Sequence, residues 1–192
     1  MGDVMSKTQI EASTLLYPVP VALVSCGDMD GRPNIITIAW TGIVCSDPPM
    51  VSISIRPHRY SSRIIKESKE FVLNIPTEEI LKKTDMCGVI SGEDHDKFSE
   101  VGLTPLRGKV VKAPLIDECP VNLECRVKHI KALGAHDIYL AEIVAAHADD
   151  NVIKKGKIDA SRTRPILFIP PNSEYWAAGG KIGTYAFTSK KR

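Results

Sequence analysis

The sequence lacks the motifs that assign a chain to several large enzyme classes. Neither a G-x-G-x-x-G stretch nor a Walker-type loop occurs, so a nucleotide site of the familiar kind is not predicted. The 5 histidines show no H-x-x-x-H spacing, and no G-x-S-x-G elbow is present. We therefore expect neither a metal centre nor a hydrolase. No apolar run is long enough to span a bilayer, and we expect no membrane segment.

Cysteine and excess charge are also scarce. The 5 cysteines are odd in number and include no C-x-x-C pair, which favours free thiols in a reducing compartment over a disulfide framework. Pro18 and Pro20 interrupt the stretch before Cys26, so it does not resemble a signal peptide, and we expect a cytoplasmic protein. With 25 basic and 23 acidic side chains, the net charge of +2 argues against a nucleic-acid partner.

What is present is the balance of a globular protein, with 43% hydrophobic and 25% charged residues among 192, enough for a single domain over 1–192. Hydrophobic patterning predicts several short strands and two short helices. The predicted strands are 19–25, 34–40, 50–56, 71–75, 121–130, 138–146 and 166–169, the helices are 61–68 and one from 77 onward, and 87–96 is a predicted loop. This predicts a mainly β domain, a closed or partly open barrel with a few short helices.

The strand at 50–56 alternates strictly. Val51, Ile53 and Ile55 share one face, whereas Ser52 and Ser54 share the other face with Arg56. A sheet with one apolar side and one small polar side is predicted here.

The turn after that strand has the chemistry of an anion site. Arg56-Pro57-His58-Arg59 leads into a helix whose first turn holds Ser61 and Ser62. Helix N-terminal amides, hydroxyls and arginine all bind phosphate. The alternative is a capped surface helix after a solvated basic turn, and the motif alone does not choose between them.

Two further stretches could contact a ligand. The predicted strand from Asn34 ends on Trp40-Thr41-Gly42, which could offer a flat ligand an aromatic wall and open amides, although Trp40 could equally be core and Gly42 a bend. Lys97, in His95-Asp96-Lys97-Phe98, could neutralise a phosphate or a ring edge, or could simply begin a charged helix.

Taken together, these stretches resemble the FMN-binding split-barrel family of flavin reductase-like proteins, most closely its flavoredoxin-type branch. The resemblance covers about residues 14–187. The matching pieces are Pro20–Val24, Asn34–Gly42, Asp47–Val51, Arg56-x-x-x-Tyr60-Ser61, Phe71–Asn74, Asp96–Phe98 and Gly102–Thr104, and their order and spacing are specific where no single piece is.

The resemblance implies a six-stranded Greek-key split barrel that forms a homodimer with one FMN per subunit and takes electrons from NAD(P)H by hydride transfer. Ala39, Trp40, Thr41 and Gly42 would line the flavin ring. The remaining implied cofactor-binding residues are Asn34, Ser54, Arg56, Tyr60, Ser61, Asn74, Lys97 and Phe168. Of these, Ser54, Arg56 and Ser61 would hold the phosphate and ribityl chain.

Three functions stay open at this point. The chain could be an NAD(P)H-dependent flavin or ferric reductase, or an electron carrier that receives electrons from a partner protein. The third possibility is a small-molecule-binding barrel that has lost the cofactor, which the intact sets Trp40-Thr41-Gly42 and Arg56/Ser61 disfavour.

Overall fold

The structure, a computed structural model, describes residues 6–189. In this part of the chain no helix has both the length and the apolar character needed to cross a membrane. The strands are β1 (Val19–Pro20), β2 (Ala22–Cys26), β3 (Asn34–Ile38), β4 (Thr41–Ser46), β5 (Pro49–Ile55), β6 (Glu70–Ile75), β7 (Pro105–Leu106), β8 (Leu115–Ile116), β9 (Val121–Ala132), β10 (Asp137–Ala148), β11 (Ile153–Lys154), β12 (Lys157–Ile158), β13 (Ile166–Ile169) and β14 (Glu174–Ala177). The helices are α1 (Tyr60–Ser68), α2 (Leu81–Val89), α3 (Lys97–Val101) and α4 (Ala160–Thr163), with short 3-10 helices η1 (Glu78–Ile80) and η2 (Asp150–Val152).

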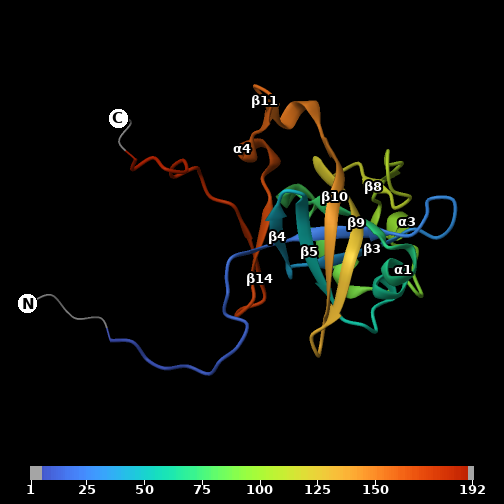
Figure 1. The fold of residues 1–192 in the computed structure, drawn as a ribbon, viewed down its shortest axis with the longest axis horizontal. Coiled ribbons are helices and arrows are strands. Elements are labelled where there is room, and N and C mark those ends of the chain that lie inside the picture. The colour runs from blue at the N-terminus through green and yellow to red at the C-terminus, as the bar shows by residue number, and fades with distance from the viewer. Residues whose placement is uncertain (1–5, 190–192) are drawn as a thin grey trace, which may run out of the picture.

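Seven antiparallel strands form the main sheet, in the order β3-β2-β6-β9-β10-β5-β4. The two edge strands, β3 and β4, are consecutive in the chain and are joined by Ala39 and Trp40 alone. The edges of a flat sheet of this size lie roughly 29 Å apart, and two linking residues span only about 11 Å. The sheet therefore curls until its edges meet (Figure 1). This is the mainly β, Greek-key split barrel that the sequence predicts, with a seventh strand in its main sheet.

The core fills the inside of the curled sheet. Val51, Ile53 and Ile55 of β5 are almost fully buried and the serines between them are only half-buried, which confirms the alternation predicted for this strand. They pack with apolar side chains from β2, β3, β6, β9 and β10, and with Ile65 of α1. One apolar face thus accounts for the barrel interior, and the other face of β5 is left free to line a site.

Helices α2 and α3 cover the outer face of β2 and β3. Leu23 and Ile35 point outward from the barrel and pack with Cys87 of α2 and Phe98 of α3 in a second core cluster. Because both faces of this part of the sheet are buried, β3 is held from two sides. The position of its end, at Ala39 and Trp40, is fixed by that packing.

Several local predictions were wrong. Strand β4 was not predicted, and α2 extends to Val89 into the predicted loop 87–96. The serines of α1 do not cap it. Arg59 is the N-cap and has no side-chain cap bond, while Ser61 and Ser62 are buried. The hydroxyl of Ser62 instead pairs with that of Tyr139, at 2.7 Å, so the helix is tied to β10.

Candidate functional site

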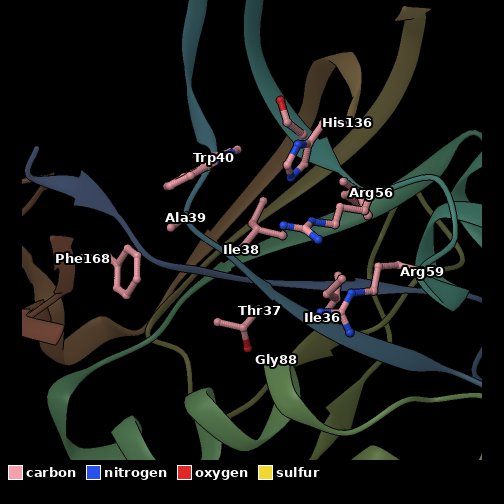
Figure 2. Close-up of a pocket in the computed structure, with 12 residues that line it drawn as sticks. Ile36, Thr37, Ile38, Ala39, Trp40, Arg56, Arg59, Gly88, His136 and Phe168 are labelled. Atoms are coloured by element: carbon pink, nitrogen blue, oxygen red, sulfur yellow. The ribbon is translucent and has the colours of Figure 1, made fainter. Parts of the chain in front are cut away.

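A cavity of about 220 Å³ opens where β3 passes into β4. Its walls come from β3, the end of β5, the turn between β9 and β10, helix α2 and β13 (Figure 2). The residues that line it are Ile36, Thr37, Ile38, Ala39, Trp40, Ser54, Ile55, Arg56, Arg59, Gly88, His136 and Phe168. Segments more than a hundred residues apart in the sequence therefore meet at one site.

One end of the cavity is positively charged. Arg56 follows β5 and Arg59 precedes α1, and the amide of Arg59 donates to the carbonyl of Arg56 at 3.0 Å, which closes a tight turn. Both guanidinium groups extend toward the cavity (Figure 2). Within residues 6–189 neither guanidinium has a hydrogen-bond or ion-pair partner. Two arginines on one turn, without protein carboxylates to neutralise them, form a site for an anion with several oxygens.

His136 lies beside this charged end. It belongs to the turn between β9 and β10, where its carbonyl accepts from the amide of Leu133 at 2.9 Å. Burial, and secondarily the charge of Arg56, lower the pKa of His136 below its ordinary value of 6.5. The ring is therefore neutral at pH 7 and presents one donor and one acceptor to the cavity.

The other end of the cavity is aromatic. Trp40 and Phe168 flank Ala39 there, with the side chain of Ile38 between the aromatic and arginine ends (Figure 2). Phe168 is held from behind by Tyr175, at a distance of 5.4 Å between ring centroids. The chain of β13 that carries it also pairs with β1, where Phe168 lies opposite Val19. Flat apolar walls of this kind suit an aromatic ring system.

A second hollow of about 390 Å³ continues the site past Trp40. It shares Ala39, Trp40 and Ser54 with the first cavity and is bordered by Thr41 and Gly42. A Cβ atom placed on Gly42 would have no heavy atom within 4 Å, so the space beside Gly42 on that side of β4 is empty. The two hollows form an elongated site with a charged end, a small polar middle at Ser54 and an aromatic, open end.

Gly88 of α2 fits closely under the cavity. A Cβ atom at this position would lie 3.2 Å from the Cβ of Thr37, which also lines the cavity. Such an approach is tighter than ordinary van der Waals contact, and the absence of a side chain lets the helix pack against β3 without narrowing the site.

Other residues expected at the site lie inside the protein. The amide of Asn34 donates to the Ser61 hydroxyl at 2.8 Å, and the Asn34 carbonyl oxygen has no partner among the described residues. The side-chain nitrogen of Lys97 donates to the carbonyls of Ile35 and Cys87, at 2.9 and 2.7 Å. Burial lowers the pKa of Lys97. These side chains hold β3, α1, α2 and α3 together and do not line the cavity.

Asn74 and Tyr60 also lie away from the cavity lining. The Asn74 amide donates to the carbonyl of Leu23 at 2.9 Å, and its carbonyl oxygen accepts from the amide of Ile116 at 3.1 Å and from Asn122 at 2.9 Å. Tyr60, the first residue of α1, is covered by arginines, of which Arg63 lies 4.9 Å from the ring centroid.

The structure adds residues that the sequence analysis did not propose for the site. Arg59 was part of the predicted basic turn but was not proposed as a cofactor-binding residue. Arg56 was the only arginine of that turn proposed for this role. His136 is 80 positions from Arg56 and carries no motif of its own, so only the tertiary fold reveals it.

The potential metal ligands and two of the thiols can be described from the structure. Within residues 6–189 there is no cluster of three or more side chains that could hold a metal ion. The cysteines are free, and burial raises the pKa of Cys87 to about 11 and that of Cys26 to about 12. Both thiols are therefore protonated at neutral pH and unreactive.

Comparison with known proteins identifies the same architecture. Residues 14–170 match the model of the flavin reductase like domain. The flavoredoxin of Desulfovibrio vulgaris (Miyazaki F) aligns with a TM-score of 0.90 at 36% identity over 97% of this chain and 100% of its own. The flavoredoxin of Methanosarcina acetivorans aligns with a TM-score of 0.90 at 32% identity over 97% and 98% of the two chains. An FMN-binding protein from Thermus thermophilus shares the fold, with a TM-score of 0.76 at 17% identity over 96% and 99%.

Proposed function

The chain belongs to the flavin reductase-like family, and we propose that it binds FMN and passes electrons from NAD(P)H through this cofactor to an acceptor. The observation that carries the proposal is the cavity with Arg56 and Arg59, unpaired among residues 6–189, at one end and Trp40 and Phe168 at the other. A charged phosphate and a flat ring on one molecule match these two ends.

Each lining residue has a role that follows from its chemistry. Arg56 and Arg59 would bind the phosphate, and Ser54, in the middle of the site, would contact the ribityl chain. Trp40 and Phe168 would enclose the ring. The empty space beside Gly42, next to Thr41, would receive the polar edge of the ring. FMN supplies the two-electron redox chemistry when bound, and the protein supplies placement and electrostatics.

The buried residues Asn34, Ser61, Asn74 and Lys97, and the half-buried Tyr60, would act on the cofactor indirectly. They hold the strands and helices that carry the lining side chains. Loss of such a residue would lower the stability of the protein before it altered any contact to FMN.

FMN is favoured over FAD because the arginine pair suits a terminal phosphate monoester, whose charge is concentrated on one group. The relatives' names agree with this choice, since the Thermus thermophilus protein is an FMN-binding protein. Mass spectrometry of cofactor released from the purified or FMN-reconstituted protein tests it. Release of FMN is expected, and release of FAD alone would contradict the proposal.

The source of the electrons distinguishes an NAD(P)H-dependent reductase from an electron carrier that is reduced by a partner protein. Flavoredoxins are among the structures that align over nearly the whole chain, which favours as second candidate an electron carrier that receives electrons from a partner protein. Anaerobic mixing of the FMN-loaded protein with NADH or NADPH decides the matter. Rapid bleaching of the flavin absorbance is expected, and its absence with both nucleotides would leave the carrier function.

A homodimer is part of this proposal. Strand β4 is an edge of the sheet next to the site, and its side chains Ile43 and Val44 are 72% and 48% exposed. Exposed apolar side chains on an edge strand are a typical surface for a second subunit. Sedimentation of the FMN-loaded protein should report a dimer, and a monomer that retains FMN fully would contradict a site at the subunit boundary.

A further inference from the structure

A hollow of about 1250 Å³ lies on another part of the molecule, between the β11–β12 hairpin, α4 and residues 177–183. Figure 1 shows β11 and α4 beyond one end of the long strands β9 and β10. Five basic and two acidic side chains line this hollow, which we call the basic cleft. The charge of its lining has one dominant sign.

Both acidic side chains in the cleft are neutralised locally. Glu78 pairs with Arg164, and Asp159 lies 4.0 Å from Lys154. The other three lysines, at positions 155, 157 and 181, have no hydrogen-bond or ion-pair partner in the part of the chain that the structure describes. The cleft therefore has an excess of three positive charges, more than the net charge of +2 of the whole chain.

The β11–β12 hairpin carries Lys154, Lys155 and Lys157, and repulsion between these charges lowers its stability. Lys155 and Gly156 have φ values of 51° and 73°, as in a tight two-residue hairpin turn, so the lysines beside them are held in place. Lys154 and Lys157 lie directly opposite each other in the ladder. Like charges in this position are destabilising; Asp159 lies 4.0 Å from Lys154, and a partner of opposite charge at Lys157 would reduce the penalty further.

The form of the cleft distinguishes between kinds of ligand. A small anion needs convergent donors in a confined pocket, and pockets for small molecules are smaller, usually up to about 1000 Å³. Here residues 153–157 are all exposed, and Lys155 and Lys157 lie on a projecting hairpin, with Lys181 in the exposed segment facing it. Exposed charges of one sign act over longer distances, on the approach and orientation of a second protein.

The basic cleft is connected to the cofactor site through one ribbon. Pro165 and Ala177, at one end of the β13–β14 pair, line the cleft. Phe168, three residues after Pro165 and paired with Tyr175, lines the cavity proposed for FMN. With a rise of about 3.3 Å per residue, the two positions are roughly 10 Å apart along the strand.

We infer that the basic cleft docks an acidic electron-carrier protein, which takes electrons from the cofactor at the other end of this ribbon. The inference rests on the proposed function and names the acceptor of that reaction. Two carriers would each be reduced by one electron, the cofactor would return to its oxidised form, and its protons would pass to solvent. The carrier's surface carboxylates would meet the three lysines without ion-pair partners.

Two forms of one haem protein provide the test. Native cytochrome c has a basic surface, and succinylation converts its lysines into acidic groups while the haem is unchanged. The FMN-loaded protein, reduced with dithionite so that no nicotinamide is needed, is mixed anaerobically with each form. We expect faster reduction of the succinylated form. Raising the ionic strength from about 0.01 M to about 0.15 M should slow it, because the screening length falls from about 30 Å to about 8 Å.

Charge reversal in the cleft locates the effect. The triple substitution Lys155→Glu, Lys157→Glu and Lys181→Glu should slow reduction of the succinylated form by about tenfold or more. Its binding to the protein, measured by fluorescence anisotropy with and without FMN, should weaken in parallel. The matched control reverses three exposed lysines elsewhere that have no ion pair, Lys69, Lys109 and Lys131, and should change either quantity far less.

The outcomes separate the two proposals. Equal rates and equal binding for the two cytochrome forms, or the same loss in the cleft variant and the control, would overturn the docking surface even if FMN binding and NAD(P)H oxidation were normal. Conversely, if FMN did not bind, preferential binding of the succinylated form by the cleft would still be measurable. That result would support docking while the proposed function failed.

Discussion

Two polar regions of this molecule differ in whether the protein itself supplies hydrogen-bond partners to their side chains. At the mouth of the cavity, Arg56 and Arg59 have no partner among residues 6–189. Inside the protein, Asn74 uses its amide and carbonyl on Leu23, Ile116 and Asn122. A polar group whose hydrogen bonds are all made within the protein typically has a structural role. A charge left without a partner in a cavity indicates a ligand-binding role. The sequence analysis had placed one residue of each kind, Arg56 and Asn74, in a single list of cofactor-binding residues.

The largest effect is expected from the satisfied region. Asn74→Ala leaves the Ile116 amide without its side-chain acceptor, removes the donor to the Leu23 carbonyl and the Ser25 hydroxyl, and takes one of two partners from the Asn122 amide; each buried group left unsatisfied costs about 1–3 kcal/mol. Denaturant unfolding should show a loss of about 3 kcal/mol or more. FMN affinity of the folded fraction should stay unchanged. A stable variant that has lost FMN affinity would reverse the comparison and place Asn74 at the ligand.

The aromatic end of the site should give an intermediate effect. Trp40→Ala removes one flat wall, and we expect about a tenfold loss of affinity, or about 1.4 kcal/mol. Because the wall contacts the ring and not the phosphate, FMN and riboflavin should lose affinity alike in fluorescence titrations. A loss confined to FMN would mean that Trp40 acts at the phosphate end.

The smallest effect concerns Lys97 and depends on pH. Burial lowers its pKa below the ordinary 10.5, so the folded state binds this proton less tightly than the unfolded state. This group therefore makes the wild type gain stability as the pH rises from the lowered pKa toward 10.5. In Lys97→Met that pH-dependent contribution is absent, and the loss of the donor to two carbonyls adds a pH-independent destabilisation of about 1–3 kcal/mol for each carbonyl left unsatisfied.

Urea unfolding of wild type and Lys97→Met at several pH values between 7 and 10 measures this difference. The gap in stability between them should widen in favour of the wild type as pH rises. A constant gap would show that the amine titrates normally and that its burial has no electrostatic cost.

The fold could be predicted wherever the sequence pattern has a buried face. Strand β5 was found because Val51, Ile53 and Ile55 alternate with small polar residues. Strand β4 was missed because Ile43 and Val44 are both exposed at the sheet edge, and its pairing with β5 leaves no period of two in burial. The serines of α1 were misread as caps because burial against Asn34 and Tyr139 is not visible locally.

The site residues could be predicted where a short motif with distinctive chemistry marked them. Trp40 and Arg56 were proposed from short motifs with distinctive chemistry, and both line the cavity. Asn74 was proposed from a resemblance, and Lys97 from a short charged stretch that the resemblance then matched; neither reports orientation, and both side chains face the protein interior. His136 comes from a turn with no local signal, and only the pairing of β9 with β10 beside β5 brings it to Arg56.

The affinity of Arg56→Ala for FMN and for riboflavin tests the central claim most directly. Removal of a charge-assisted contact to phosphate costs about 1.5–3 kcal/mol. FMN affinity should therefore fall by about 10- to 150-fold. Riboflavin, which has no phosphate, should bind the variant as it binds the wild type. Arg56→Lys should recover part of the loss, because lysine keeps the charge without the planar fork. Equal losses for both ligands would contradict the account and make Arg56 a structural residue of a solvated basic turn.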